Sequence, residues 1–219
     1  MYILMKNGFI CHEKLKGIFP FTFKEPAKRS SKNRVAGTLE TKAITQVTKD
    51  VSRSYLIHKV LPAIKAKWPI SGVRETIFIQ QDNAKPHIHS LDVDFLEAGR
   101  EDGFDIRLAC QPPQSPDMNV LDLGFFRAIQ SLQHQEAPAT IDELVYAVEK
   151  SFEELSPESL DCVFLTLQAC MIEVMKVNGG NNKKLPHMNK SQLTRCGVLP
   201  SQLQCEREIV EKTVAYLQQ

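Results

Sequence analysis

The chain has 219 residues, a formal net charge of +1 and 42% hydrophobic residues, which is enough apolar material for a folded core. No apolar run reaches the roughly 18 residues that a membrane helix requires. Lys6 interrupts the apolar start of the chain, which makes it a poor signal peptide. We therefore expect no membrane partner. The six cysteines form no C-x-x-C pair, which indicates reduced thiols in an intracellular protein.

The charge is distributed unevenly along the sequence. Residues 24–67 carry eleven Lys/Arg against three Asp/Glu, whereas residues 75–161 carry five against eighteen. This polarity predicts a face for an anionic partner in the first segment. For the acidic segment we favour solvated helix surfaces.

The N-terminal third predicts a strand, a basic arm and a helix. Aromatic residues alternate over 17–23, which favours a strand, and Pro20 favours a sheet edge or a strand end. Residues 24–42 are polar, basic and without apolar periodicity, so we expect a loop or arm. Apolar residues recur on one face of a helix over 48–67, and we expect Pro62 to kink or end it.

The middle of the chain predicts an α/β fold. A buried-type strand at 76–80 precedes a helix from about Pro86, which Gly99 and Gly103 should break. A second strand follows at 104–109. Alternation of strands and helices favours an α/β sheet with helices packed on it. Further helices are expected near 118–133, 140–155, 157–177 and 201–218.

Two aspartates, Asp82 and Asp122, are separated by 39 residues. Asp82 follows a predicted strand, and the carboxyl ends of such strands line the sites of α/β folds. An Asx-turn explains it equally well. For Asp122 the residues alone favour a capping role, as the third helical residue after an Asn119 cap. Two carboxylates on a rigid frame can also bind divalent cations.

The motifs IFIQQDNAKPH and QPPQSPDMNVLDLGFF resemble the second and third catalytic motifs of mariner-like transposases, in particular the plant-type branch with an all-aspartate triad. The resemblance extends through GIFPFTFKEPAKRSSKNRVAGTLETK, VLPAIKAKWP and GGNNKKLPHM, from about Gly17 to Pro200. It implies a ribonuclease-H-like DDE transposase/integrase core, a mixed sheet flanked by helices. It also implies that Asp82 and Asp122, rather than Asp117, are the catalytic and metal-binding residues.

The same resemblance implies two Mg²⁺ (or Mn²⁺) ions, DNA at transposon ends as the partner, a homodimer and a nuclear location, with no small-molecule substrate. The family's first aspartate lies in a motif resembling DEKWF, and no such motif occurs here. We therefore expect the chain to begin after that strand and to lack the helix-turn-helix DNA-binding region. Residues 1–135 are expected to form a partial catalytic core and 136–219 a helical extension.

The expected function is that of a truncated transposable-element protein, descended from an enzyme of DNA integration and inactive alone. Two alternatives stay open, a transposase-derived binding module without catalysis and an intact nuclease with an unrecognised third acid. Four basic residues are candidate DNA contacts or a nuclear-import patch, with a solvated loop as the alternative; they are Lys28, Arg29, Lys32 and Arg34. His87 matches a histidine of the family motif, and His87 and His89 lack partners at zinc-like spacing.

Overall fold

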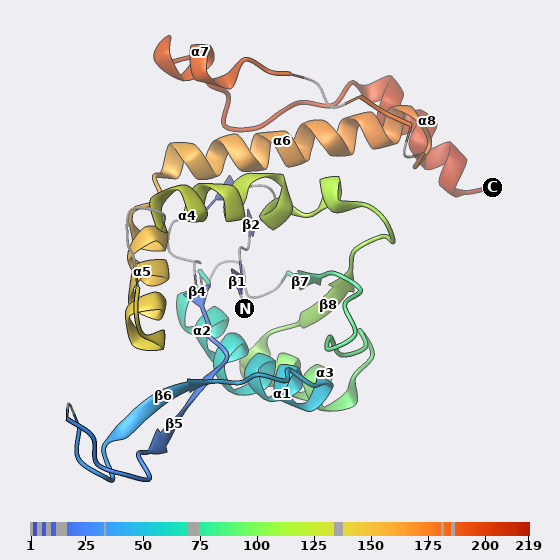
Figure 1. The fold of residues 1–219 in the computed structure, drawn as a ribbon. Coiled ribbons are helices and arrows are strands. Elements are labelled where there is room, and N and C mark those ends of the chain that lie inside the picture. The colour runs from blue at the N-terminus through green and yellow to red at the C-terminus, as the bar shows by residue number, and fades with distance from the viewer. Residues whose placement is uncertain are drawn as a thin grey trace.

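A computed structural model describes residues 2–3, 6–7, 10–11, 17–32, 34–69, 75–133, 138–180, 182–184 and 187–219. Helices are combined with small two-stranded sheets (Figure 1), which confirms the prediction of a mixed helix and sheet protein. No helix within these ranges is long and apolar enough to cross a membrane.

A β–α–β unit forms the centre of the fold. Strands β7 (Ile77–Gln81) and β8 (Ile106–Cys110) pair in parallel, with Ile77 opposite Ile106 and Gln81 opposite Cys110. Helix α3 (Val93–Arg100) connects them and is followed by the short 3-10 helix η4 (Glu101–Gly103). Both strands were predicted, within two residues of their observed bounds. Alternate residues of each strand are buried, because one face of the pair packs on helices.

Helix α3 begins later than the sequence predicted. The chain forms turns after Pro86, and Asp92 is the N-cap, its carboxylate accepting a hydrogen bond from the Phe95 amide. Leu91 lies in the turn before the helix and is exposed. Gly99 does not break the helix; it lies inside it, where a Cβ would come within 2.5 Å of the Ile106 carbonyl oxygen. Only Gly103, at φ +79°, lies at a helix end.

Residues 49–67 form one helical path made of three elements. They are α1 (Lys49–Tyr55), the π-helical turn η2 (Leu56–Val60) and α2 (Leu61–Lys67). Pro62 lies in the first turn of α2 and does not end the helix. Of the two expected effects of this proline, a kink or an end of the helix, the second is therefore wrong. Proline has no N–H to donate, and the first turn of a helix tolerates that loss. The π-helical turn η2 ends at Leu61, whose backbone N–H donates a hydrogen bond to the Leu56 carbonyl oxygen five residues earlier.

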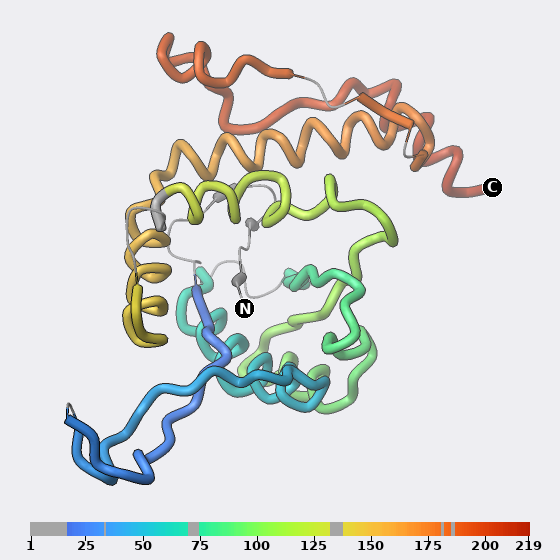
Figure 2. Tube along the Cα trace, in the orientation of Figure 1, coloured from blue at the N-terminus to red at the C-terminus, as the bar shows by residue number. Residues whose placement is uncertain are grey.

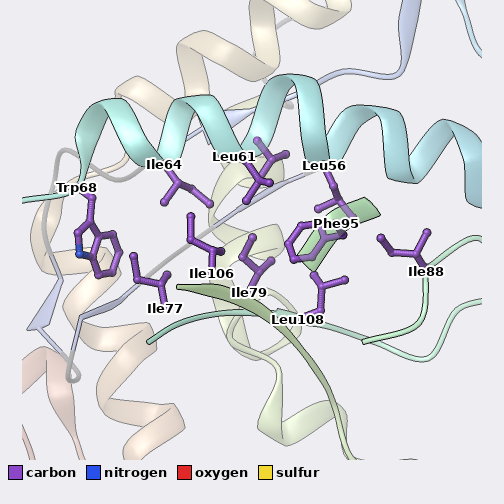
Figure 3. Close-up of a cluster of buried hydrophobic side chains, with 11 residues drawn as sticks. Leu56, Leu61, Ile64, Trp68, Ile77, Ile79, Ile88, Phe95, Ile106 and Leu108 are labelled. Atoms are coloured by element: carbon purple, nitrogen blue, oxygen red, sulfur yellow. The ribbon is translucent and has the colours of Figure 1, made fainter. Parts of the chain in front are cut away.

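The main core lies between this helical path and the β7–β8 pair. In Figure 3 the helix side chains point towards the strands, with Phe95 of α3 between them. Phe95 and Ile106 are fully buried. The cluster consists of Leu56, Val60, Leu61, Ile64, Trp68, Ile77, Ile79, Ile88, Phe95, Ile106 and Leu108.

The segment predicted as a basic loop is a β-hairpin. Strands β5 (Thr22–Pro26) and β6 (Leu39–Ala43) pair antiparallel, so only residues 27–38 connect them. The hairpin projects from the body of the molecule (Figures 1 and 2). Its strands escaped prediction because neither has a fully buried face that would impose an apolar alternation. Tyr55 holds its base, since the hydroxyl donates to the Thr22 carbonyl at 3.0 Å.

The strand predicted at 17–23 is divided at Pro20. The Thr22 amide turns back to the Pro20 carbonyl at 2.9 Å. Residues before the turn form β4 (Gly17–Ile18), which pairs with β1 (Tyr2–Ile3). Strands β2 (Lys6–Asn7) and β3 (Ile10–Cys11) form a further short antiparallel pair.

The second half is helical. After the 3-10 helix η5 (Pro116–Met118) and the π-helical turn η6 (Leu121–Phe125) come α4 (Phe126–Gln133), α5 (Ile141–Glu153), α6 (Pro157–Lys176), α7 (Lys190–Arg195) and α8 (Arg207–Leu217). Helix α5 begins after the N-cap Thr140 and α6 after the N-cap Ser156, each within one residue of its expected start. Helix α8 begins six residues later than the expected start at 201. Phe125 packs edge-on against Phe152. A second core cluster thus joins residues on both sides of the domain boundary proposed near residue 135, and that boundary stays a prediction.

Candidate metal-binding cavity and basic hairpin

A cavity of about 340 Å³ lies at the carboxyl end of β7, and both Asp82 and Asp122 line it. Its apolar wall includes Phe21, Leu56 and Phe126. The polar part adds Gln80, Gln81, His87, Gln111 and Asn119 to the two carboxylates. Asp82 directly follows β7, and Asp122 lies in η6, which comes after β8 in the chain. The structure therefore brings acids from two separate elements to one cavity.

Asp82 is placed by the end of strand β7. Its Oδ1 accepts a hydrogen bond from the Ala84 amide at 2.8 Å, which is the Asx-turn that the sequence allowed. His87 Nδ1 lies 2.9 Å from that same oxygen and 2.9 Å from the Asp82 carbonyl oxygen. The Asp82 side chain is 52% exposed. The turn therefore orients the carboxylate without burying it, and a cation can reach it from solvent.

Asp122 lies in η6, and its role differs from the predicted cap. Asn119 does cap the turn, because its Oδ1 accepts from the Leu121 amide at 3.0 Å. The Asn119 amide N–H, however, bonds to the Pro116 carbonyl, and Asp122 Oδ2 accepts instead from the Asn119 side-chain amide at 2.9 Å. A capping box needs the backbone amide as donor. Asp122 is therefore held by a side chain, and it is exposed at the cavity.

Side-chain amides fix the two halves of the cavity to each other. Gln80 donates to the Met118 carbonyl at 2.8 Å, and Asn83 donates to the Gln111 carbonyl at 2.7 Å. The Gln111 amide continues the strand pairing by donating to the Gln81 carbonyl. We did not anticipate Gln80 or Gln111 from the sequence. Their positions in or next to the two acidic motifs could have indicated this role, because polar residues at the ends of strands form hydrogen bonds to the loops that follow.

The donors at this cavity suit a hard divalent cation. Carboxylate oxygens, with water completing the shell, are the ligands that Mg²⁺ takes in proteins. Within the ranges that the structure describes, no group of three or more His, Cys, Asp or Glu side chains is arranged to hold a metal ion. The geometry thus offers two carboxylates and an adjacent imidazole. His89 is engaged elsewhere, since its Nδ1 accepts from the Leu91 amide at 3.1 Å.

The four basic candidates all lie on the hairpin loop, but they differ in their surroundings. Lys28, Arg29 and Lys32 are exposed. Arg34 is half-buried and forms an ion pair with Glu40, which neutralises its charge locally. The structure therefore leaves three cations exposed on the hairpin loop and pairs Arg34 within the chain.

The hairpin is tied to helix α5 at its base. Thr41 donates a hydrogen bond to the Asp142 carboxylate, and Lys24 Nζ lies 3.4 Å from the same oxygen. The Thr41 hydroxyl, followed by Lys24, holds the pKa of Asp142 below its usual range. Because these contacts fix the base, the direction in which the hairpin leaves the body is set by α5 as well as by Tyr55.

Asp117 does not line the cavity. Its carboxylate pairs with Lys183 Nζ at 2.6 Å, so of the two neighbouring acids Asp122 is the one that lines the cavity. The preference for Asp122 as a ligand stays a prediction. No protein-family model, curated protein or solved structure matches this chain. The motifs and the geometry of this cavity are therefore the features that indicate a function.

Proposed function

We propose that the chain is a catalytic region of the mariner-like transposase type, in which Asp82 and Asp122 bind a divalent cation. The observation that supports this proposal is the convergence of the two acids on one cavity at the carboxyl end of a parallel strand pair. Sites of α/β folds occur at that edge. In this proposal the β7–β8 pair and its flanking helices belong to a ribonuclease-H-like sheet.

The cation would serve phosphodiester chemistry on DNA. In a two-ion site, one ion would activate the attacking oxygen as a nucleophile, and the other would stabilise the leaving oxygen of an in-line displacement. Asp82 and Asp122 would hold one such ion between them, and His87 would orient the Asp82 carboxylate through the 2.9 Å contact. The two acids alone bind an ion loosely, so we propose that the purified chain does not cut DNA.

The projecting hairpin supports the second part of the proposal, a nucleic-acid partner. Its three exposed cations suit phosphate groups, and contacts of this kind are independent of sequence. The same observation favours an alternative function, a transposase-derived module that binds DNA without catalysis. A nuclear location and a homodimer belong to the proposal by resemblance alone.

Line broadening by Mn²⁺ in amide NMR spectra tests the cation site. A bound paramagnetic ion should broaden signals next to both acids, those of Asn83 and Ala84 on one side and of Leu123 on the other. Asp82→Asn should greatly reduce broadening on both sides, because the two acids share one ion. Glu97→Gln, an exposed acid on α3, serves as the matched control and should leave the pattern intact. Broadening confined to surface acids elsewhere would refute the proposed site.

A further inference from the structure

An ion pair outside the lining of the cavity connects two segments that are distant in the sequence. Lys183, in the segment that follows α6, contacts Asp117 of η5 at 2.6 Å. The Lys183 side chain is only 5% exposed and that of Asp117 22%. Charged side chains are buried to this extent only when they are paired. Such a pair, once formed, holds its two segments together.

Cys170 of α6 contributes no opposing charge here. The thiol is fully buried, and that burial, together with the negative charge of Asp117, raises its pKa. The thiol therefore stays neutral, and Asp117 is the anion that balances Lys183.

Asp117 is connected to Asp122 by a short series of contacts. The next residue, Met118, accepts the Gln80 hydrogen bond from strand β7. Asn119 bonds back to the Pro116 carbonyl at 3.1 Å and donates its side-chain amide to Asp122. Any displacement of η5 therefore moves the group that orients the Asp122 carboxylate.

A second contact fixes η6 from the same side. Gly124 lies against α6, where an added Cβ would come within 3.0 Å of Val163 Cγ2. The turn that carries Asp122 is thus held at one end by the Asp117–Lys183 pair and at the other by packing on α6. Both contacts come from the C-terminal half of the chain.

We propose that Lys183 is a positioning residue for the cavity. Its ion pair with Asp117 fixes η5 and η6 so that Asp122 faces the same space as Asp82. The C-terminal segment after α6 is therefore part of the site, not a separate extension. The effect on cation binding rests on the proposed function, whereas the effect on the position of η6 does not.

Amide hydrogen exchange tests the positioning directly. Lys183→Met and Asp117→Asn should each speed exchange at the amides of Asn119 and Leu123 at least tenfold, while amides in the middle of α3 keep their native rates. Lys184→Met, at the exposed neighbouring lysine, should change neither. The double variant Asp117→Asn/Lys183→Met leaves no buried charge unpaired, so it should fold even if Lys183→Met does not. It should still show fast exchange in η6.

Mn²⁺ broadening on the same variants separates positioning from general stability. Because Asp82 and Asp122 share the ion, displacing Asp122 in the double variant should require severalfold more Mn²⁺ for the same broadening at Ala84 and Leu123, while amides in the middle of α3 keep their native exchange rates. A general loss of stability would instead speed exchange in α3 as well. Native exchange rates at Asn119 and Leu123 in the double variant would overturn the inference. Absence of broadening in the unmodified chain would overturn the proposed cation site, and the exchange rates would still decide the role of Lys183.

Discussion

Substituting Gly99 with alanine should destabilise the protein although alanine favours helices. The added Cβ would lie 2.5 Å from the Ile106 carbonyl oxygen, a backbone atom of β8 that cannot rotate away. Helix α3 must therefore move off the strand by roughly an ångström, in an interior packed to crystal-like density. Such overpacking costs about 1–3 kcal/mol. A clash with a backbone atom lies in the upper part of that range, about 2–3 kcal/mol. Replacing glycine inside a helix returns about 1 kcal/mol, so we expect a net loss of about 1–2 kcal/mol.

Urea unfolding measures this loss. With an m-value of about 2 kcal/mol per molar urea, the midpoint should fall by roughly 0.5–1 M. Trp68, the single tryptophan, is buried in the same core, so its fluorescence reports on this unit while circular dichroism reports on the whole chain. Glu97→Ala, on the exposed side of α3, is the control and should leave the midpoint nearly unchanged. An equal or higher midpoint for Gly99→Ala would show that α3 does not press on β8 as the structure has it.

Three further predictions concern DNA binding, pH and catalysis. If the three exposed cations at the hairpin tip contact phosphates, the logarithm of duplex-DNA affinity should fall with the logarithm of salt concentration at a slope of about −2.7, so that fourfold more salt weakens binding about 40-fold; these cations are Lys28, Arg29 and Lys32. Replacing all three with alanine should flatten this slope in a salt titration, and adding Arg34→Ala should change it little further. An unchanged slope would mean that the tip makes no phosphate contact. Hydrogen bonding from Arg53 lowers the pKa of Asp92, so the stability from this pair is present above the unfolded pKa of about 3.9 and is lost as pH falls through the lower folded pKa. The Asp92→Asn variant should be less stable than the unmodified chain at pH 7 and should lose less of its remaining stability on acidification. Parallel profiles of stability against pH for the two proteins would argue against the pair. The purified chain should show no Mg²⁺-dependent nicking of duplex DNA, because two carboxylates cannot hold two ions for an in-line displacement; robust nicking abolished by Asp82→Ala would restore the intact-nuclease alternative.

The sequence predicted the central strands well because they are buried on one face and their apolar residues recur regularly. It missed the hairpin strands, since no residue of β5 or β6 is fully buried and the strands carry lysine, threonine and glutamate. It extended α3 too far towards its N-terminus because Ile88 is apolar and buried, although it lies in a turn and not in the helix. The Asp92 cap, which Arg53 holds from another helix, could not be read from local pattern.

At the candidate site, too, the sequence predicted local features but not the long-range contacts. Asp82 and Asp122 were identified from their motifs, and the structure places both at one cavity. The contacts that position them were not foreseen. The Asp117–Lys183 pair joins residues 66 positions apart, and Gly124 meets Val163 of α6. Contacts of this range depend on how helices pack, which residue spacing along the chain does not specify.

A double-mutant cycle on Mn²⁺ affinity tests most directly whether Asp82 and Asp122 bind the same ion. The four proteins are the unmodified chain, Asp82→Asn, Asp122→Asn and the double variant, each titrated with Mn²⁺ under one buffer condition. If the two carboxylates share an ion, each single substitution removes most of the affinity, and the second adds little. The account predicts this strongly non-additive result. Independent losses that multiply in the double variant, or single variants that bind Mn²⁺ as tightly as the unmodified chain, would contradict it.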